Sequence, residues 1–178
     1  AISQVIRFGV EVIAPMEVLE ITTKGQYKCL KLSSGEEVNA RAVVITTGVQ
    51  YRKLLAPGMD ELAGAGIYYG AAMTEAGATK DKIVYMVGGG NSAGQGAVYL
   101  SKYAKQVYIS IRRPDLTSSM SSYLIDQIDA IDNIEVLPFS EIVEAVGENN
   151  KLAKIQIKNV ETDVISEKPA DALFIFIG

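Results

Sequence analysis

The sequence predicts an α/β fold in which a parallel βαβ core is followed by a β-meander and preceded by a further β-rich segment. Three observations carry this prediction. The apolar run at residues 82–87 is typical of a strand buried on both faces of a parallel sheet. A glycine-rich turn with a helical pattern follows, and a second apolar strand occupies residues 106–111. The stretches on either side are short apolar runs separated by turn residues, which is the pattern of β-strands.

The turn between the first strand and the helix reads Gly-Gly-Gly-Asn-Ser-Ala and fits the pattern G-x-G-x-x-A. In this pattern Gly88 permits the tight turn, Gly90 lets the backbone approach a pyrophosphate, and Ala93 lets the helix lie close to the strand. Free N–H groups at the helix start receive the phosphate charge. We expect Asn91 and Ser92 to cap these donors when no ligand is bound. The predicted phosphate-binding residues are Gly88, Gly89, Gly90, Asn91, Ser92 and Ala93.

The alternative interpretation of this glycine turn is a purely structural one, in which the glycines serve packing only. The context favours a ligand, because the turn follows a strand and opens a helix with small and apolar residues on one face. That face comprises Ala93, Ala97, Leu100 and Ala104. The sequence therefore predicts a Rossmann-like dinucleotide-binding domain over residues 82–178.

The end of the second strand indicates which dinucleotide is bound. An acid there accepts hydrogen bonds from the ribose of NAD, whereas arginine accommodates the 2′-phosphate of NADP. This chain has Arg112 and Arg113, about 22 residues after Gly90, where the motif expects roughly 20. The nearest acid, Asp115, lies beyond Pro114, and we expect it to point away. NADPH is favoured over NADH; the alternative is an ordinary solvated pair of arginines.

Composition excludes several classes of function. The chain has 178 residues, 48% of them hydrophobic, and a net charge of −4, so it has no basic surface for nucleic acid. Its apolar runs are shorter than a membrane span, and no leader is visible. With no histidine and one cysteine, it offers no zinc site, histidine base or internal disulfide. We expect no metal site and a cytoplasmic protein, with Cys29 packed in a strand rather than reactive.

The order of elements suggests an incomplete repeat. A helix is expected over residues 1–8, and another after Ser118 and Ser119 with Met120, Leu124, Ile128 and Ile131 on its buried face. Strands are expected at residues 9–13, 17–21, 27–32, 37–38, 42–46, 134–137, 141–146, 152–160, 164–165 and 172–178. Residues 9–48 resemble residues 133–178 in order, but lack a preceding glycine turn. We therefore expect a fragment: the C-terminal part of a truncated first nucleotide-binding domain at 1–48, a glycine-punctuated connection at 49–81, and the NADPH-binding domain at 82–178. The family resemblance described next implies that the truncated domain at 1–48 is an FAD-binding domain.

A family likeness emerges from several short motifs in order. Thr46-Thr-Gly48, then Tyr51-Arg-Lys-Leu54 and Pro57-Gly58, resemble a run in thioredoxin reductases. The segment 64–69, the glycine turn and the paired arginines continue the same pattern. The resemblance implies hydride transfer from NADPH to FAD and on to a redox disulfide, with no catalytic acid or base required. It also implies that Ile177 and Gly178 line the dinucleotide site and that Thr46, Thr47 and Gly48 face the flavin.

The chain departs from the family at two places. The C-x-x-C pair of thioredoxin reductases corresponds to Gly70 and Met73, so the electron acceptor is unknown. A further family arginine corresponds to Thr117, which weakens the expected phosphate clamp. We expect an enzyme when full length and an inactive fragment alone; a homodimer is compatible with the resemblance. The alternatives are a non-catalytic, nucleotide-binding redox sensor, which the missing dithiol suggests, and a methyltransferase, which the arginines disfavour.

Overall fold

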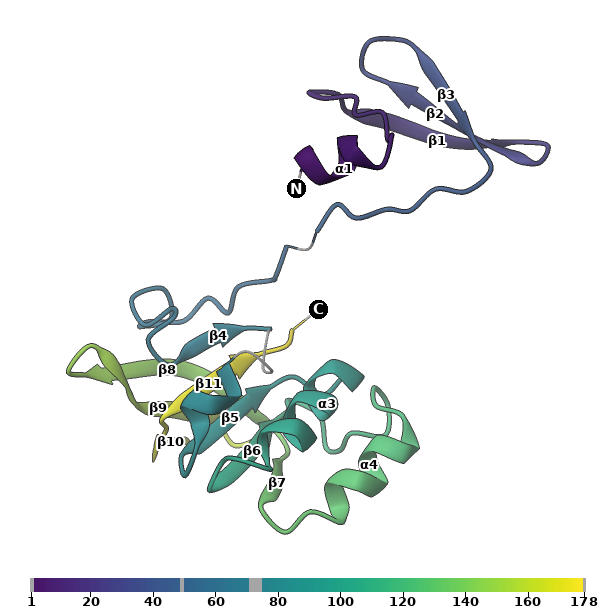
Figure 1. The fold of residues 1–178 in the computed structure, drawn as a ribbon. Coiled ribbons are helices and arrows are strands. Elements are labelled where there is room, and N and C mark those ends of the chain that lie inside the picture. The colour runs from purple at the N-terminus through teal and green to yellow at the C-terminus, as the bar shows by residue number, and fades with distance from the viewer. Residues whose placement is uncertain (1, 49, 71–74, 178) are drawn as a thin grey trace. The chain divides into compact units, whose positions relative to one another are not determined.

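The computed structural model describes residues 2–48, 50–70 and 75–177. They belong to two compact units, unit 1 (Ala1–Val49) and unit 2 (Gln50–Gly178). Figure 1 labels the helices and strands of both. Each unit has its own sheets, so each is described by itself.

Unit 1 consists of one short helix and a three-stranded antiparallel sheet in the order β1-β2-β3. Its elements are α1 (Ile2–Arg7), β1 (Val18–Lys24), β2 (Tyr27–Leu32) and β3 (Glu37–Ala40). Among the three strands only β2 has buried residues, Cys29 and Leu32. The predictions of a helix at the start, of the three strands and of a packed Cys29 are confirmed.

Two further strands predicted for unit 1 were wrong. Residues 9–13 and 42–46 have no strand structure, and Val10, Val44 and Ile45 are more than half exposed. A strand exists only through pairing, and among the described residues of unit 1 the only sheet is the β1-β2-β3 meander, which does not include these stretches. The corresponding segments of unit 2 are strands because each pairs with a parallel neighbour.

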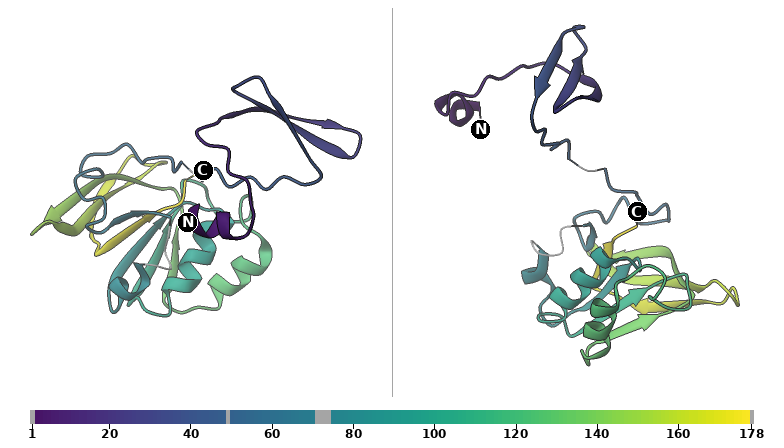
Figure 2. Two further views of the ribbon diagram at one scale, coloured as in Figure 1. Left: turned by 45° about the horizontal axis from the view of Figure 1, so that its top comes forward. Right: turned by 90° about the vertical axis from the view of Figure 1, so that its right-hand side faces the viewer.

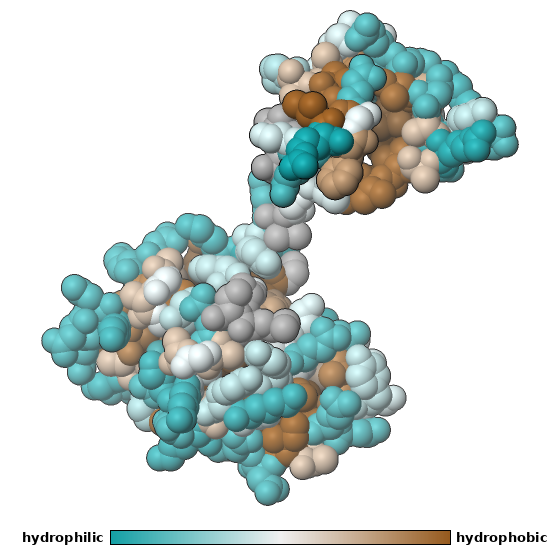
Figure 3. Space-filling view, in the orientation of Figure 1, coloured by the Kyte–Doolittle hydropathy of each residue, from teal (hydrophilic) through white to brown (hydrophobic). Residues whose placement is uncertain are grey.

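Unit 1 exposes much apolar surface. Every residue of β1 is exposed, and Cys29 and Leu32 are the only buried hydrophobic residues among those described in this unit. Figure 3 shows apolar side chains gathered over it. The two large hydrophobic cores of the described residues both lie in unit 2. Burial of apolar area is the main stabilising term in folding, so this term favours unit 2 far more than unit 1.

Unit 2 is built on a five-stranded, all-parallel sheet in the order β4-β11-β5-β6-β7. Its strands are β4 (Ile67–Tyr69), β5 (Ile83–Val87), β6 (Gln106–Ser110), β7 (Ile134–Leu137) and β11 (Ala172–Ile175). A second, antiparallel sheet contains β8 (Ser140–Glu148), β9 (Lys151–Asn159) and β10 (Ile165–Pro169). This meander has the same antiparallel succession of strands as β1-β2-β3, in agreement with the proposed repeat.

The parallel sheet of unit 2 is the middle of three layers. Helices α3 (Asn91–Leu100) and α4 (Ser122–Asp129) cover one face, and the β8–β10 meander covers the other (Figures 1 and 2). Along β5, Val84 and Met86 pack on the helical side, whereas Tyr85 and Val87 pack on the meander side. This two-sided burial explains the uninterrupted apolar run that identified the strand.

Both helices present the faces expected from the sequence. In α3, Ala93, Ala97 and Leu100 are buried, and in α4 so are Leu124 and Ile128. Ala104 and Met120 are also buried but lie outside the helices, and Ile131, expected on the buried face, lies beyond the end of α4 and is half-buried. The second helix begins later than predicted, however, because its N-cap is Ser121 rather than Ser118 or Ser119. Among the described residues, no helix is long and apolar enough to span a bilayer.

Part of the segment expected to connect two domains belongs to the core of unit 2. β4 was not predicted, yet Ile67 is 1% exposed and the strand pairs with β11. Met59 and Leu62 are buried on the meander side of the sheet. The Leu152 N–H donates to the Ala65 carbonyl at 2.9 Å, which ties this segment to β9. A short 3₁₀ helix, η1 (Ala76–Thr79), follows.

Candidate nucleotide site

The glycine turn after β5 has one position that requires glycine and one that leaves space. Gly88 has φ of +130°, and a Cβ there would lie 2.4 Å from the carbonyl oxygen of Phe176. Gly90 has the extended angles φ −88° and ψ 173°, and a Cβ there would meet nothing within 4 Å. The chain therefore needs Gly88 for its own packing, whereas the absence of a side chain at Gly90 keeps open space at the helix start.

The first turn of α3 has no side-chain cap. Gly90 is the N-cap residue, and no side chain bonds the free N–H groups there. The prediction that Asn91 and Ser92 cap these donors was wrong. Asn91 Oδ1 instead accepts hydrogen bonds from the Ser121 N–H at 2.8 Å and the Ser121 Oγ at 3.1 Å, which joins α3 to the start of α4. Ser92 is exposed, and Ala93 is fully buried.

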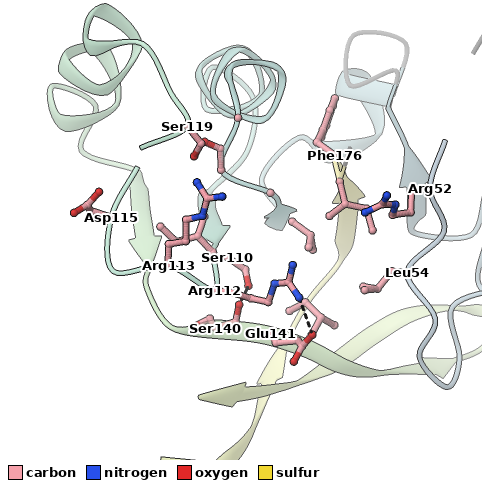
Figure 4. A pocket seen from close by; sticks show the side chains of 17 residues that line it. Arg52, Leu54, Ser110, Arg112, Arg113, Asp115, Ser119, Ser140, Glu141 and Phe176 are labelled. Atoms are coloured by element: carbon pink, nitrogen blue, oxygen red, sulfur yellow. Dashed lines mark hydrogen bonds and ion pairs between the residues drawn. The ribbon is translucent and has the colours of Figure 1, made fainter. Parts of the chain in front are cut away.

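A cavity of about 450 Å³ lies beside this turn (Figure 4). Its walls come from the glycine turn, the carboxyl ends of β5, β6 and β11, the start of β8, and residues 52 and 54. In the sheet β5 lies between β11 and β6, so the order of the strands reverses direction at this place. In open α/β sheets, ligands bind at such switch points, outside the carboxyl ends of the strands.

The two predicted arginines line this cavity. Arg113 Nη1 donates to Ser118 Oγ at 2.9 Å, and Arg112 Nη1 lies 3.9 Å from Glu141 Oε1. Ser119 Oγ donates to the Gly89 carbonyl at 2.8 Å, so the segment after the arginines is tied to the glycine turn. The cavity thus contains both a cationic region after β6 and the open position at Gly90.

Asp115 was expected to point away from the arginines. It lies in the lining of the cavity, but its Oδ1 accepts hydrogen bonds from the Thr117 N–H at 2.9 Å and Thr117 Oγ1 at 2.6 Å. The hydroxyl and N–H of Thr117 hold the pKa of this carboxyl below its usual range. In Figure 4 it lies at the edge of the site. The Asp115 carboxylate is therefore held by hydrogen bonds from Thr117 in its own loop.

Some predicted site residues meet in this cavity and others do not. Gly88, Gly89, Gly90, Arg112, Arg113 and Ile177 line it. Asn91, Ser92 and Ala93 follow the turn but are not in the lining. Gly178 lies outside the described residues. Thr46, Thr47 and Gly48 are exposed residues of unit 1 and are not in the lining either.

The cavity side chains that sequence reasoning missed include Arg52, Ser119 and Glu141. Arg52 stood within the family-like motif, but nothing in its local pattern indicated a ligand. Ser119 was interpreted as a helix cap. Glu141 lies about 30 residues beyond the arginines, and only the packing of β8 against the end of β6 brings it there. No local signal identifies such a residue.

The chain's single thiol is buried and shielded from solvent. Cys29 is 2% exposed, and its Sγ donates to Glu37 Oε2 at 3.1 Å. This hydrogen bond, together with burial, raises the pKa of the Cys29 thiol above its usual value. The described residues contain no group of three side chains suited to a metal ion.

A parallel sheet covered on both faces, an open glycine turn at an uncapped helix start, and basic side chains at the next strand end define a Rossmann-type α/β domain. Comparison with known proteins agrees. The family model described as Pyridine nucleotide-disulphide oxidoreductase matches residues 2–178, and the chain belongs to this family.

Individual relatives place it among proteins like thioredoxin reductase. It is 36% identical over 176 residues to the thioredoxin reductase of Streptomyces coelicolor, which covers 99% of this chain and 53% of that protein. The thioredoxin reductase structure from Streptococcus pyogenes matches 99% of the chain and 56% of its own, with 31% identity and a TM-score of 0.71. The one from Giardia duodenalis has the same coverage, 26% identity and a TM-score of 0.81.

The resemblance to thioredoxin reductases deduced from the motifs is thereby confirmed. The chain spans about half the length of the curated relatives it matches. Two positions correspond to the family dithiol. Gly70 directly follows β4, and Met73 lies outside the described residues.

Proposed function

We propose that unit 2 binds NADPH in the cavity beside the glycine turn and that the whole protein uses it to reduce FAD. The observation that carries this proposal is that one cavity joins the open turn at Gly90 to Arg112 and Arg113. A pyrophosphate needs the first, and a 2′-phosphate needs the second.

The residues present fit a dinucleotide. Helix α3 has ten residues, and no side chain caps the backbone N–H groups of its first turn. This helix N-terminus attracts negative charge. A side chain at Gly90 would fill the space that a pyrophosphate needs. Ile177 and Phe176, from the end of β11, add apolar surface to the same cavity. These residues would hold and orient the nucleotide.

The preference for the phosphorylated form depends on the arginines. A guanidinium matches phosphate oxygens with paired N–H donors, and hydrogen bonds of this kind are stronger than neutral ones. Arg113 bonds a neutral hydroxyl, so its charge is available to a phosphate. The Asp115 carboxylate is bound by Thr117.

The proposal that the whole protein binds FAD rests on family membership. Thr46, Thr47 and Gly48 are exposed and form no wall of the cavity. Hydride transfer between the two bound cofactors is their own chemistry, and the protein supplies position. Cys29 is the only cysteine in the sequence, so these 178 residues supply no dithiol to receive electrons.

A nucleotide-sensing role is the second candidate, and the missing dithiol favours it. A full-length protein whose yellow colour does not bleach with NADPH would support it.

The test replaces both arginines. Arg112→Ala with Arg113→Ala should weaken NADPH at least about tenfold, since each loses a charged hydrogen bond of about 1.5–3 kcal/mol that solvent partly offsets. NADH should change less than about threefold. Isothermal titration of the 178-residue chain measures both affinities.

A control variant removes the same charge elsewhere. Lys80→Ala with Lys105→Ala takes two exposed cations that do not line the cavity, and it should leave both affinities unchanged. Equal losses of NADPH and NADH in the arginine variant would refute the specificity. We further expect the purified chain to bind NADPH without holding FAD or turning over; tight FAD binding by the chain would contradict this.

A further inference from the structure

The two arginines of the cavity are held by unequal partners. Arg113 bonds the neutral hydroxyl of Ser118, whereas Arg112 faces the carboxylate of Glu141. In Figure 4 the Arg112 guanidinium is directed to Glu141, and that of Arg113 extends toward Ser119. A phosphate that binds Arg112 must therefore compete with a carboxylate that the chain itself supplies.

The backbone holds Glu141 beside the arginines. The Ser140 N–H donates to the Ile111 carbonyl at 2.7 Å, and Ser110 Oγ donates to the Ser140 carbonyl at 3.1 Å. These bonds join the start of β8 to the end of β6. The next residue, Ile142, is 2% exposed and anchors the strand in the core. Glu141 is therefore placed by the fold, although its carboxylate remains in contact with the cavity.

The lysine that lies opposite Glu141 in the neighbouring strand is already engaged. Lys158 is its cross-strand partner in β9, but Lys158 Nζ bonds Asp163 Oδ1 at 2.6 Å. Among the described residues, the ion pair of Glu141 is the one with Arg112. With side chains 75% and 40% exposed, this pair is weak enough for a ligand to break, yet breaking it reduces the net gain from the phosphate.

We propose that Glu141 is a specificity-determining residue: by occupying Arg112 it lowers the pocket's preference for NADPH over NADH. Arg113 supplies most of the remaining preference. The inference rests on the proposed function, because it concerns the same nucleotide site.

The test uses two probes that differ only in the 2′-phosphate, adenosine 2′,5′-bisphosphate and 5′-AMP. Their dissociation constants are measured by isothermal titration of the 178-residue chain. Glu141→Gln keeps the size and hydrogen-bonding capacity of the side chain but removes its charge. It should raise the ratio of the AMP constant to the bisphosphate constant by about two- to fivefold, which is the scale of a solvent-exposed charge pair.

Two further variants separate contact from general charge. Glu144→Gln removes a carboxylate from the same strand outside the cavity lining, and the ratio should stay within about 1.5-fold of wild type. In an Arg112→Ala background, Glu141→Gln should no longer raise the ratio, because the arginine it releases is absent. An unchanged urea midpoint and circular dichroism spectrum verify folding of each variant.

Each outcome decides the matter. If the wild-type chain binds neither probe, the proposed function fails and this inference falls with it. If it binds both and Glu141→Gln leaves the ratio unchanged, the inference alone is overturned. A gain of equal size without Arg112, or with Glu144→Gln, also overturns it.

Discussion

The two outer glycines of the turn should respond in opposite ways to the same substitution. Gly88→Ala places a methyl group 2.4 Å from the Phe176 carbonyl oxygen, in a backbone conformation with φ of +130°. Gly90→Ala places one where nothing lies within 4 Å, at ordinary extended angles. The first change therefore perturbs folding, and the second perturbs only the space at the helix start.

The magnitude follows from two terms. Backbone strain at such a φ costs about 1–3 kcal/mol. The carbonyl of Phe176 must also move, although its own N–H is bonded to the Val87 carbonyl at 2.8 Å, and overpacking of this kind costs about 1–3 kcal/mol. Gly88→Ala should thus lower the free energy of unfolding by about 2–6 kcal/mol, a large share of the 5–15 kcal/mol typical of a domain. Gly90→Ala should change it by less than about 0.5 kcal/mol.

Urea unfolding, followed by circular dichroism, measures the stabilities, and titration with NADPH measures binding. At about 2 kcal/mol per M, Gly88→Ala lowers the midpoint by about 1–3 M. Gly90→Ala keeps its midpoint and weakens NADPH at least about tenfold, because the pyrophosphate can no longer approach the backbone. Equal midpoints for the two variants, or normal NADPH binding by Gly90→Ala, would refute the reasoning.

Three other predictions follow from single contacts. Asn91→Ala removes the acceptor of two hydrogen bonds from Ser121 and should lower stability by about 1–3 kcal/mol in urea; a loss below about 0.3 kcal/mol would show that the contact is idle. Burial raises the pKa of Tyr85 to about 12. The folded state then binds its proton more tightly than the unfolded state, so stability falls as pH rises from about 10 to 12, and Tyr85→Phe should flatten that decline in thermal melts. Because the hydrogen bond to Glu37 raises the pKa of the Cys29 thiol, Glu37→Gln should lower that pKa, which the pH dependence of the thiolate ultraviolet absorbance of the folded protein measures; an unchanged pKa would contradict this.

The βαβ unit was predictable because its signals are local. The apolar run of β5, the glycines at 88 and 90 and the spacing of Ala93, Ala97 and Leu100 are each set by contacts within about 20 residues. The arginines at the end of β6 followed from the same register. The structure places these elements as expected.

The errors in strand assignment have a common physical cause. β4 has three residues between glycines, and it is a strand only because β11 lies beside it. Residues 42–46 have a stronger strand pattern, yet they have no strand beside them in the described part of unit 1. Pairing depends on a distant partner and is invisible in a local pattern. The same applies to Glu141, which enters the cavity through the hydrogen bond between Ser140 and Ile111.

The residues around the cavity come from two layers of unit 2 that differ in how well they tolerate substitution. The glycine turn is confined by the backbone of β11, so almost any change at Gly88 harms the fold. Glu141 sits on the outer meander, with a side chain 40% exposed, where substitution is structurally cheap. A lineage could therefore retune which cellular pool of reducing equivalents it draws on by altering one meander position, while the inherited turn stays intact.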